Sequence, residues 1–229
     1  MIPYSRQTIS KSDINSVVNV LKSDFLTQGP QNIKFENNLK KKFGAKYALT
    51  CNSASSALHL ACRSLDINKG DILWTVPNTY AASANCALLL GAKVDFIDIE
   101  EHTFNISVTE LESKLIIAKK NKKLPKAIIV VHFAGLPCNL KAIHKLKNKY
   151  KFKLIEDASH AIGAKYHNDV IGKPVYSDVV VFSFHPVKII TTLEGGCLLT
   201  NTKKIHKLAT YFRENGILKN KYQQSWKYK

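Results

Sequence analysis

The sequence lacks any long apolar stretch. No uninterrupted apolar run approaches the ~20 residues that a membrane-spanning helix needs. The first residues, Met1-Ile-Pro-Tyr, also lack the basic-then-apolar pattern of a secretory signal. We therefore expect no membrane-spanning helix, no membrane partner and no signal peptide at this start.

Spacings typical of metal sites are missing as well. The chain has five cysteines, and none of them forms a Cys-x-x-Cys pair or another metal-ligand spacing. We interpret them as reduced, mostly buried thiols of a cytoplasmic protein, and we expect no metal site. These cysteines are Cys51, Cys62, Cys86, Cys138 and Cys197.

Arginine is scarce although the formal net charge is +17. The only arginines are Arg6, Arg63 and Arg213, whereas base and phosphate recognition favours the forked guanidinium group. The lysines are spread along the chain, with short clusters only at 40–42 and 119–123. This pattern favours a solvated, lysine-rich surface over a nucleic-acid interface, so no nucleic-acid partner is expected.

What the sequence does contain is an alternation of apolar runs and helical patterns. At 229 residues and 45% hydrophobic, the chain can bury one substantial core. The alternation predicts an α/β fold around a mostly parallel sheet with helices on both faces. Gly195-Gly196 joins the last two runs without a helix between them, so the last strand is expected to pair antiparallel. The seven predicted strands are Tyr47–Thr50, Ile72–Val76, Lys93–Ile97, Ala127–Val131, Phe152–Ile155, Val179–Phe182 and Cys197–Thr200.

The two ends of the chain differ from this alternating part. Apolar residues in 12–22 follow helical spacing, and a second helical pattern ends at Gly44. Between them, the segment 24–30 reads as a loop that ends in Gly-Pro. After a final helical pattern, the aromatic tail 221–229 has no element that would bury it.

The first polar cluster at a predicted strand end is Asn52-Ser-Ala-Ser-Ser56. It follows a strand and precedes a helix, and ligands of open α/β sheets bind outside the carboxyl ends of the strands. Small residues there would let backbone N–H groups and the helix dipole approach a phosphate. Serine and asparagine are also the preferred residues of an ordinary helix N-cap, so both interpretations stay open here.

A second cluster, Glu156-Asp-Ala-Ser-His160, ends another buried strand. A carboxylate at such a place is costly unless it is paired, so Asp157 needs a partner. That partner is either a protonated ring nitrogen of a cofactor or a helix start that the carboxylate caps. His160 by itself reads as a structural histidine.

The third cluster contains a lysine in apolar surroundings. Lys188 stands among Val187, Ile189 and Ile190, after a strand that ends near Ser183. Apolar neighbours disfavour the ammonium form, which would free the amine for Schiff-base chemistry. In a chain this rich in lysine, a solvated surface charge is the alternative. The fourth candidate is Tyr80, which follows the predicted strand Ile72–Val76. Its ring either offers an aromatic face to a ligand or packs in the core or on the surface.

Together the four clusters match the needs of one cofactor. A phosphate site, a buried carboxylate, an aromatic plate and a lysine are what pyridoxal 5'-phosphate requires, and all four follow strands of one predicted sheet. This convergence favours a pyridoxal-phosphate enzyme over four unrelated structural features.

Four motifs also carry a family resemblance. The chain resembles the DegT/DnrJ/EryC1/StrS sugar aminotransferases along essentially its whole length. The resemblance implies the aspartate-aminotransferase fold (fold type I of the pyridoxal-phosphate-dependent transferases) and a homodimer. The motifs are Leu26-Thr-Gln-Gly29, Asn52-Ser-Ala-Ser-Ser-Ala-Leu58, Glu156-Asp-Ala-Ser-His-Ala-Ile-Gly163 and Ser183-Phe-His-Pro-Val-Lys188 with Thr191-Thr-Leu-Glu-Gly-Gly196.

The resemblance also implies roles for individual residues. Lys188 would bind the cofactor covalently and act as general base and acid. Asp157 would pair with the ring nitrogen, His160 would lie near the ring hydroxyl, and Tyr80 would stack on the ring. The phosphate would be held by Ala54, Ser55 and Ser183. A nucleotide-sugar would face Tyr4 and the loop formed by Asp24, Phe25, Leu26 and Thr27.

The implied reaction moves an amino group from glutamate to C4 of a UDP-linked 4-keto-6-deoxy-N-acetylhexosamine. An aminotransferase for another nucleotide-keto-sugar and a non-catalytic fragment are the alternatives. A related branch that dehydrates sugars resembles this one with histidine in place of the lysine, so Lys188 argues against it.

Two departures from the family pattern qualify this prediction. Leu193 stands where the family usually has a small residue, and we expect it to narrow the loop beside Lys188. Family members also continue for roughly another 150 residues as a small domain. We therefore divide the chain into an N-terminal helix and substrate loop (1–30), a cofactor-binding large domain (31–213) and the start of a C-terminal region (214–229). We expect this chain alone to aggregate readily and to bind the cofactor weakly.

Overall fold

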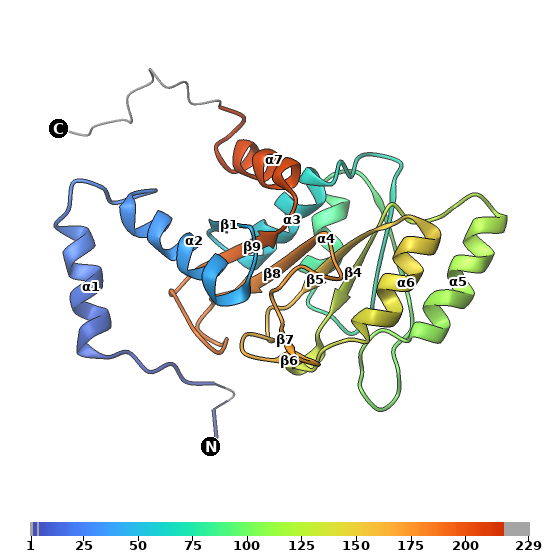
Figure 1. The fold of residues 1–229 in the computed structure, drawn as a ribbon, viewed down its shortest axis with the longest axis horizontal. Coiled ribbons are helices and arrows are strands. Elements are labelled where there is room, and N and C mark those ends of the chain that lie inside the picture. Colours follow the sequence, from blue (N-terminus) through green and yellow to red (C-terminus); the bar gives the residue numbers. More distant parts are fainter. Residues whose placement is uncertain (1, 4, 218–229) are drawn as a thin grey trace.

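The computed structural model describes residues 2–3 and 5–217, and a seven-stranded sheet forms its centre (Figure 1). The strand order is β1-β9-β8-β5-β4-β2-β3. All seven strands predicted from the apolar runs are present, with ends that differ by at most two residues. Their bounds are β1 Tyr47–Cys51, β2 Ile72–Thr75, β3 Lys93–Phe96, β4 Ala127–Val131, β5 Lys153–Asp157, β8 Val179–Ser183 and β9 Gly196–Thr200.

One strand runs against the others. The pairs β3–β2, β2–β4, β4–β5 and β5–β8 are parallel, whereas β9 pairs antiparallel with both β8 and β1. In that register, Gly196 lies opposite both Ser183 and Cys51. The antiparallel last strand expected from Gly195-Gly196 is therefore confirmed. The start of β9 lies at the same sheet edge as the ends of β1, β5 and β8.

Helices cover both faces of the sheet because successive strand residues point to opposite sides. One core lies beneath α3, α4 and α7, and it receives Ile129 and Ile155. The other lies beneath α2, α5 and α6, and it receives Ile128 and Leu154. The bounds of these helices are α2 Pro30–Phe43, α3 Ala54–Ser64, α4 Ala82–Leu88, α5 Val108–Lys120, α6 Leu140–Tyr150 and α7 Lys203–Arg213. The α/β fold class is confirmed.

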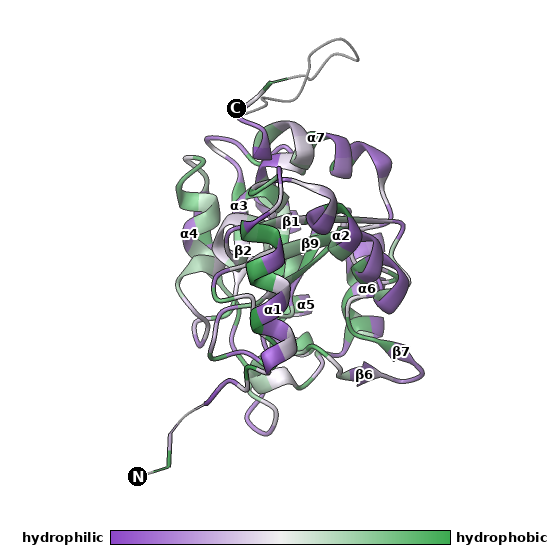
Figure 2. Ribbon diagram, turned by 90° about the vertical axis from the view of Figure 1, so that its left-hand side faces the viewer, coloured by the Kyte–Doolittle hydropathy of each residue, from purple (hydrophilic) through white to green (hydrophobic). Residues whose placement is uncertain are grey.

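The N-terminal helix stands apart from these layers. Helix α1, Lys11–Leu21, begins with a capping box between Ser10 and Asp13. It buries no residue, and four of its apolar side chains are 37–65% exposed. Figure 1 shows the helix apart from the sheet, and Figure 2 shows hydrophobic residues along it. The sequence predicted the helix correctly. These apolar residues are Ile14, Val17, Val18 and Leu21.

Three small elements had no clear sequence signal. They are the hairpin of β6 Lys165–Tyr166 and β7 Asp169–Val170, the short helix α4, and a 3-10 turn at Phe133–Gly135. No helix in the described part of the chain is long and apolar enough to cross a membrane.

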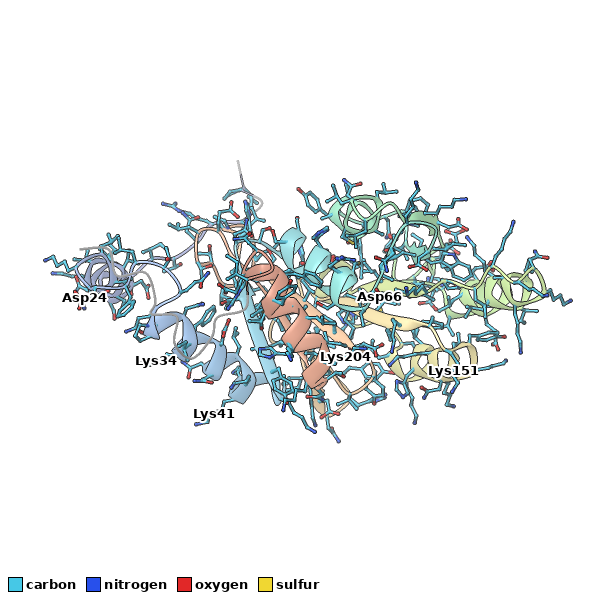
Figure 3. All side chains as sticks on the ribbon, turned by 90° about the horizontal axis from the view of Figure 1, so that it is seen from above. Asp24, Lys34, Lys41, Asp66, Lys151 and Lys204 are labelled. Carbon is cyan, nitrogen blue, oxygen red and sulfur yellow. The ribbon has the colours of Figure 1, made fainter. Side chains whose placement is uncertain are left out.

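The positive charge is dispersed over the surface. Figure 3 labels four exposed lysines that project from separate places in the fold. Lys34 and Lys41 lie on α2, Lys151 follows α6, and Lys204 lies on α7. This distribution agrees with the solvated lysine surface that the sequence suggested.

Candidate active site

One cavity of about 960 Å³ opens at the carboxyl edge of the sheet. Its volume is typical of sites for small molecules and cofactors. It is lined by residues that follow β1, β2, β4, β5 and β8. Every residue predicted to bind the cofactor contributes to this lining: Ala54, Ser55, Tyr80, Asp157, His160, Ser183 and Lys188.

The start of α3 forms one end of the cavity. Ser53 caps the helix by accepting a hydrogen bond from the backbone N–H of Ser56. Ala54 and Ser55 are the first two residues of the helix, where backbone N–H groups have no partner within the helix. Gly196 permits this arrangement, because a Cβ there would lie 2.3 Å from the carbonyl carbon of Ser53. The helix N-cap, which the sequence analysis left open as an alternative, is present. It does not use the N–H groups of Ala54 and Ser55, which lie at this end of the cavity.

The carboxylate of Asp157 lies deeper, at the last residue of β5, with the residue 5% exposed. One oxygen accepts a hydrogen bond of 2.7 Å from the Ser83 hydroxyl. The other accepts from the hydroxyl and the backbone N–H of Ser159, at 2.6 and 3.2 Å. All three donors are neutral groups. The Asp157 carboxylate can therefore accept one more hydrogen bond, from a cationic donor.

Lys188 and His160 meet across the cavity, with 2.5 Å between the lysine Nζ and the imidazole Nε2. Burial lowers the pKa of Lys188, against the opposing attraction of Asp157. Burial, and then the Lys188 charge, lower the pKa of His160. Both shifts disfavour the charged forms, and the short contact requires that one nitrogen donates while the other accepts. A neutral primary amine in this position is a nucleophile for a carbonyl.

The loop that carries Lys188 is tied back to its own strands. The backbone N–H of Phe184 donates to Gly195 at 2.8 Å, and the N–H of Thr192 donates to Phe184 at 3.0 Å. Leu193 adopts a φ of +65° and is 69% exposed. Its side chain is not among those that line the cavity, and the narrowing of the loop expected from this residue stays a prediction.

The predicted substrate residues lie elsewhere. Asp24, Phe25 and Leu26 line a separate hollow between α1 and α2, and Thr27 belongs to the same loop. Figure 3 shows Asp24 at one end of the molecule, away from the sheet. Tyr4 falls outside the described residues, although Ser5 lines the cavity. The structure does not bring the 24–27 loop to the Lys188 cavity, and its role stays a prediction.

Several residues at the cavity were given no role in the sequence analysis. Thr79 reaches Ser83 at 3.0 Å, and Asn78 and Glu194 lie at the cavity wall. His132, after β4, bonds Glu156 at 3.0 Å on the face opposite Asp157, and both side chains are buried. The Cys138 backbone N–H donates to Nδ1 of this ring, so the ring proton lies on Nε2, toward Glu156. Their polar side chains next to strand ends were the sequence signal that could have identified these residues.

Comparison with known proteins places the chain in a family. A family model described as "DegT/DnrJ/EryC1/StrS aminotransferase family" matches residues 7–229. The chain belongs to this family. A Campylobacter jejuni protein (serotype O:23/36) named UDP-4-amino-4,6-dideoxy-N-acetyl-beta-L-altrosamine transaminase is 44% identical over 221 residues. That alignment covers 96% of this chain and 57% of the relative, so the chain spans little more than half of that length.

Solved structures of family members agree with the fold. A Helicobacter pylori aminotransferase, PseC, described as involved in the biosynthesis of pseudoaminic acid, matches with a TM-score of 0.88 and 34% identity. The match covers 97% of this chain and 58% of that one. A putative sugar aminotransferase from Streptococcus pneumoniae, Spr1654, solved in its PLP form, gives a TM-score of 0.81 at 27% identity, covering 92% and 57%. The expected aminotransferase fold is confirmed.

Proposed function

We propose that this family member is the part of a nucleotide-sugar aminotransferase that binds pyridoxal 5'-phosphate. One observation carries the proposal. A single cavity combines a helix start rich in N–H groups, a buried carboxylate with an acceptor position to spare, and an amine whose pKa burial lowers. The relative solved in a PLP form supports the choice of cofactor.

The residues of the cavity fit this cofactor. Ala54 and Ser55 would hold its phosphate through backbone N–H groups, with Ser183 beside them. Asp157 would accept a hydrogen bond from its ring nitrogen, and Tyr80, which is 79% exposed at the cavity, would cover the ring. When bound, pyridoxal phosphate supplies a carbonyl for amine exchange and a ring that accepts electrons.

Lys188 is proposed as the catalytic residue. Its neutral amine would bind the cofactor carbonyl, be released by an incoming amino donor, and then carry a proton as base and acid. His160 lies at 2.5 Å from that amine and would orient it. Because burial lowers the pKa of both groups, the neutral amine that this chemistry needs is easier to reach.

We propose glutamate as amino donor and a UDP-linked 4-keto-6-deoxy-N-acetylhexosamine as acceptor, in pseudaminic acid biosynthesis. The names of the Campylobacter jejuni and Helicobacter pylori relatives support this choice. The substrate residues would be Tyr4 and the loop of Asp24, Phe25, Leu26 and Thr27, as the family resemblance implies.

We also propose a homodimer in the cytoplasm. The exposed apolar side chains of α1 give a surface that a second subunit would cover. The five cysteines are all free, which supports a reducing compartment. Analytical ultracentrifugation of the protein over a range of concentrations tests the dimer directly.

Borohydride trapping tests the assignment of the cofactor site. The protein is incubated with pyridoxal phosphate, reduced, digested and mapped by mass spectrometry. We expect the label on Lys188 and its loss in Lys188→Ala, with Lys126→Ala as a matched control that keeps the label. A label on another lysine would contradict the site. Incubation of the cofactor-loaded protein with glutamate and a panel of nucleotide-keto-sugars then tests the acceptor.

A further inference from the structure

Ser83 uses its hydroxyl differently from other helical hydroxyls in this chain. Serine and threonine within helices commonly donate to the carbonyl four residues earlier. Ser64 in α3 and Thr210 in α7 do so, at 2.6 and 2.9 Å. Ser83 in α4 is fully buried and instead donates to Asp157 at 2.7 Å, 74 residues away in sequence. Its orientation therefore serves the carboxylate and not the helix.

A second hydroxyl extends this contact into a chain of donors. Thr79 Oγ1 and Ser83 Oγ lie 3.0 Å apart, and this contact by itself does not show which hydroxyl donates. A serine hydroxyl has one proton, and that of Ser83 is committed to the carboxylate. Thr79 must then donate to Ser83. Such chains strengthen each member bond, because donation into a hydroxyl makes its own proton a better donor.

We propose that Thr79, Ser83 and Ser159 are positioning residues that keep the shared proton on the cofactor ring nitrogen and not on Asp157. This inference rests on the proposed cofactor site. None of the three hydroxyls needs to touch the cofactor. They act through Asp157, whose two oxygens they supply with neutral donors from opposite sides.

The physical reason is a competition for one proton. A ring nitrogen and a facing carboxylate share it, and the proton resides on the more basic partner. Hydrogen bonds to the ionised carboxylate lower its basicity, so they leave the proton on the nitrogen. A cation beside Asp157 would do the same, but it would also repel the protonated ring. Neutral hydroxyls stabilise the carboxylate without that repulsion.

The test measures the proton itself. Pyridoxal phosphate labelled with ¹⁵N in its ring is bound to the protein, and the ¹⁵N chemical shift reports the protonated fraction. Ser83→Ala should move that resonance toward the unprotonated value, with the proton equilibrium changed about tenfold or more. Ser159→Ala, which retains its backbone N–H donor, and Thr79→Val, one bond further away, should give smaller shifts in the same direction.

Ser64→Ala is the matched control, because it also removes a buried helical hydroxyl but one bonded to its own helix. The ring ¹⁵N resonance of the cofactor bound to this variant should coincide with that of the cofactor bound to the unmodified protein. If Ser83→Ala fails to fold, Ser159→Ala and Thr79→Val carry the test. Unchanged resonances in the variants, with the unmodified protein loaded, would overturn this inference alone. If the unmodified protein binds no cofactor, the proposed function is overturned with it.

Discussion

The contact between Gly196 and the start of α3 offers a sharp test of how the phosphate end is built. A Cβ added at Gly196 would lie 2.3 Å from the Ser53 carbonyl carbon and 2.4 Å from the Ala54 nitrogen. That is roughly 1 Å short of the about 3.5 Å at which carbon atoms make favourable contact. The atoms in the way are backbone, so no side-chain rotation relieves the overlap. In Gly196→Ala the start of α3 must move away from β9.

The magnitude follows from this geometry. Overpacking of a well-packed core costs typically 1–3 kcal/mol, and an overlap with backbone should lie near the upper end. For a chain of this size, about 3 kcal/mol corresponds to a fall in melting temperature of roughly 6–12 °C. Displacement of the Ala54 and Ser55 N–H groups should also weaken pyridoxal phosphate binding by about tenfold or more, since a hydrogen bond to a charged group contributes about 1.5–3 kcal/mol.

Thermal unfolding of the apoprotein and absorbance titration with the cofactor measure the two effects separately. Gly195→Ala is the informative comparison, because its Cβ would meet the Thr192 hydroxyl, 2.2 Å away. Thr192→Ala removes that atom, so the Thr192→Ala/Gly195→Ala pair should recover stability, whereas no side-chain deletion rescues Gly196→Ala. A Gly196→Ala protein with unchanged melting temperature and cofactor affinity would refute the close-approach argument.

Three further outcomes follow from the site. Asp157→Asn should bind the cofactor but convert it with glutamate far more slowly, by stopped-flow absorbance; near-normal conversion would exclude Asp157 as the partner of the ring nitrogen. Burial lowers the pKa of both His160 and His206, so the unfolded chain binds more protons as pH falls below about 6.5, and stability should drop there. In His206→Gln, the free energy of unfolding measured by urea titration should fall less between pH 7 and pH 5. A fall as large as in the unmodified protein would contradict this. Leu193→Gly should raise the stability by up to about 1 kcal/mol, because it relieves the left-handed φ of an exposed residue, and a lower melting temperature would argue against strain there.

The sheet, and the convergence of the strand-end residues at one cavity, were predictable from sequence for a simple reason. Each strand is a short apolar run, and its last residues turn polar where a ligand site begins, as at Asp157 and Ser183. Parallel strands bring such ends to one edge, so residues far apart in sequence converge. The antiparallel β9 was equally predictable, since Gly195-Gly196 leaves no room for a crossover helix.

The remainder escaped sequence analysis for identifiable reasons. Helix α4 has seven residues without an N-cap side chain, so neither periodicity nor capping announces it. Ser83 lies within it, and a serine carries no mark that shows whether its hydroxyl serves the helix or a distant carboxylate. The 24–27 loop was assigned to substrate by resemblance alone, and only the three-dimensional arrangement shows that its hollow is separate from the Lys188 cavity.

The electrostatics of the cavity oppose those of the whole chain, and this contrast gives the site its polarity. The chain carries a net charge of +17, yet two half-buried basic groups at the cavity, Lys188 and His160, have lowered pKa values. The hydrogen-bond donors to Asp157 are all neutral groups. At the other end, the start of α3 presents the positive end of a helix dipole. A cavity with these two ends would suit a molecule with a cation at one side and an anion at the other, as the proposed cofactor has in its protonated ring and its phosphate.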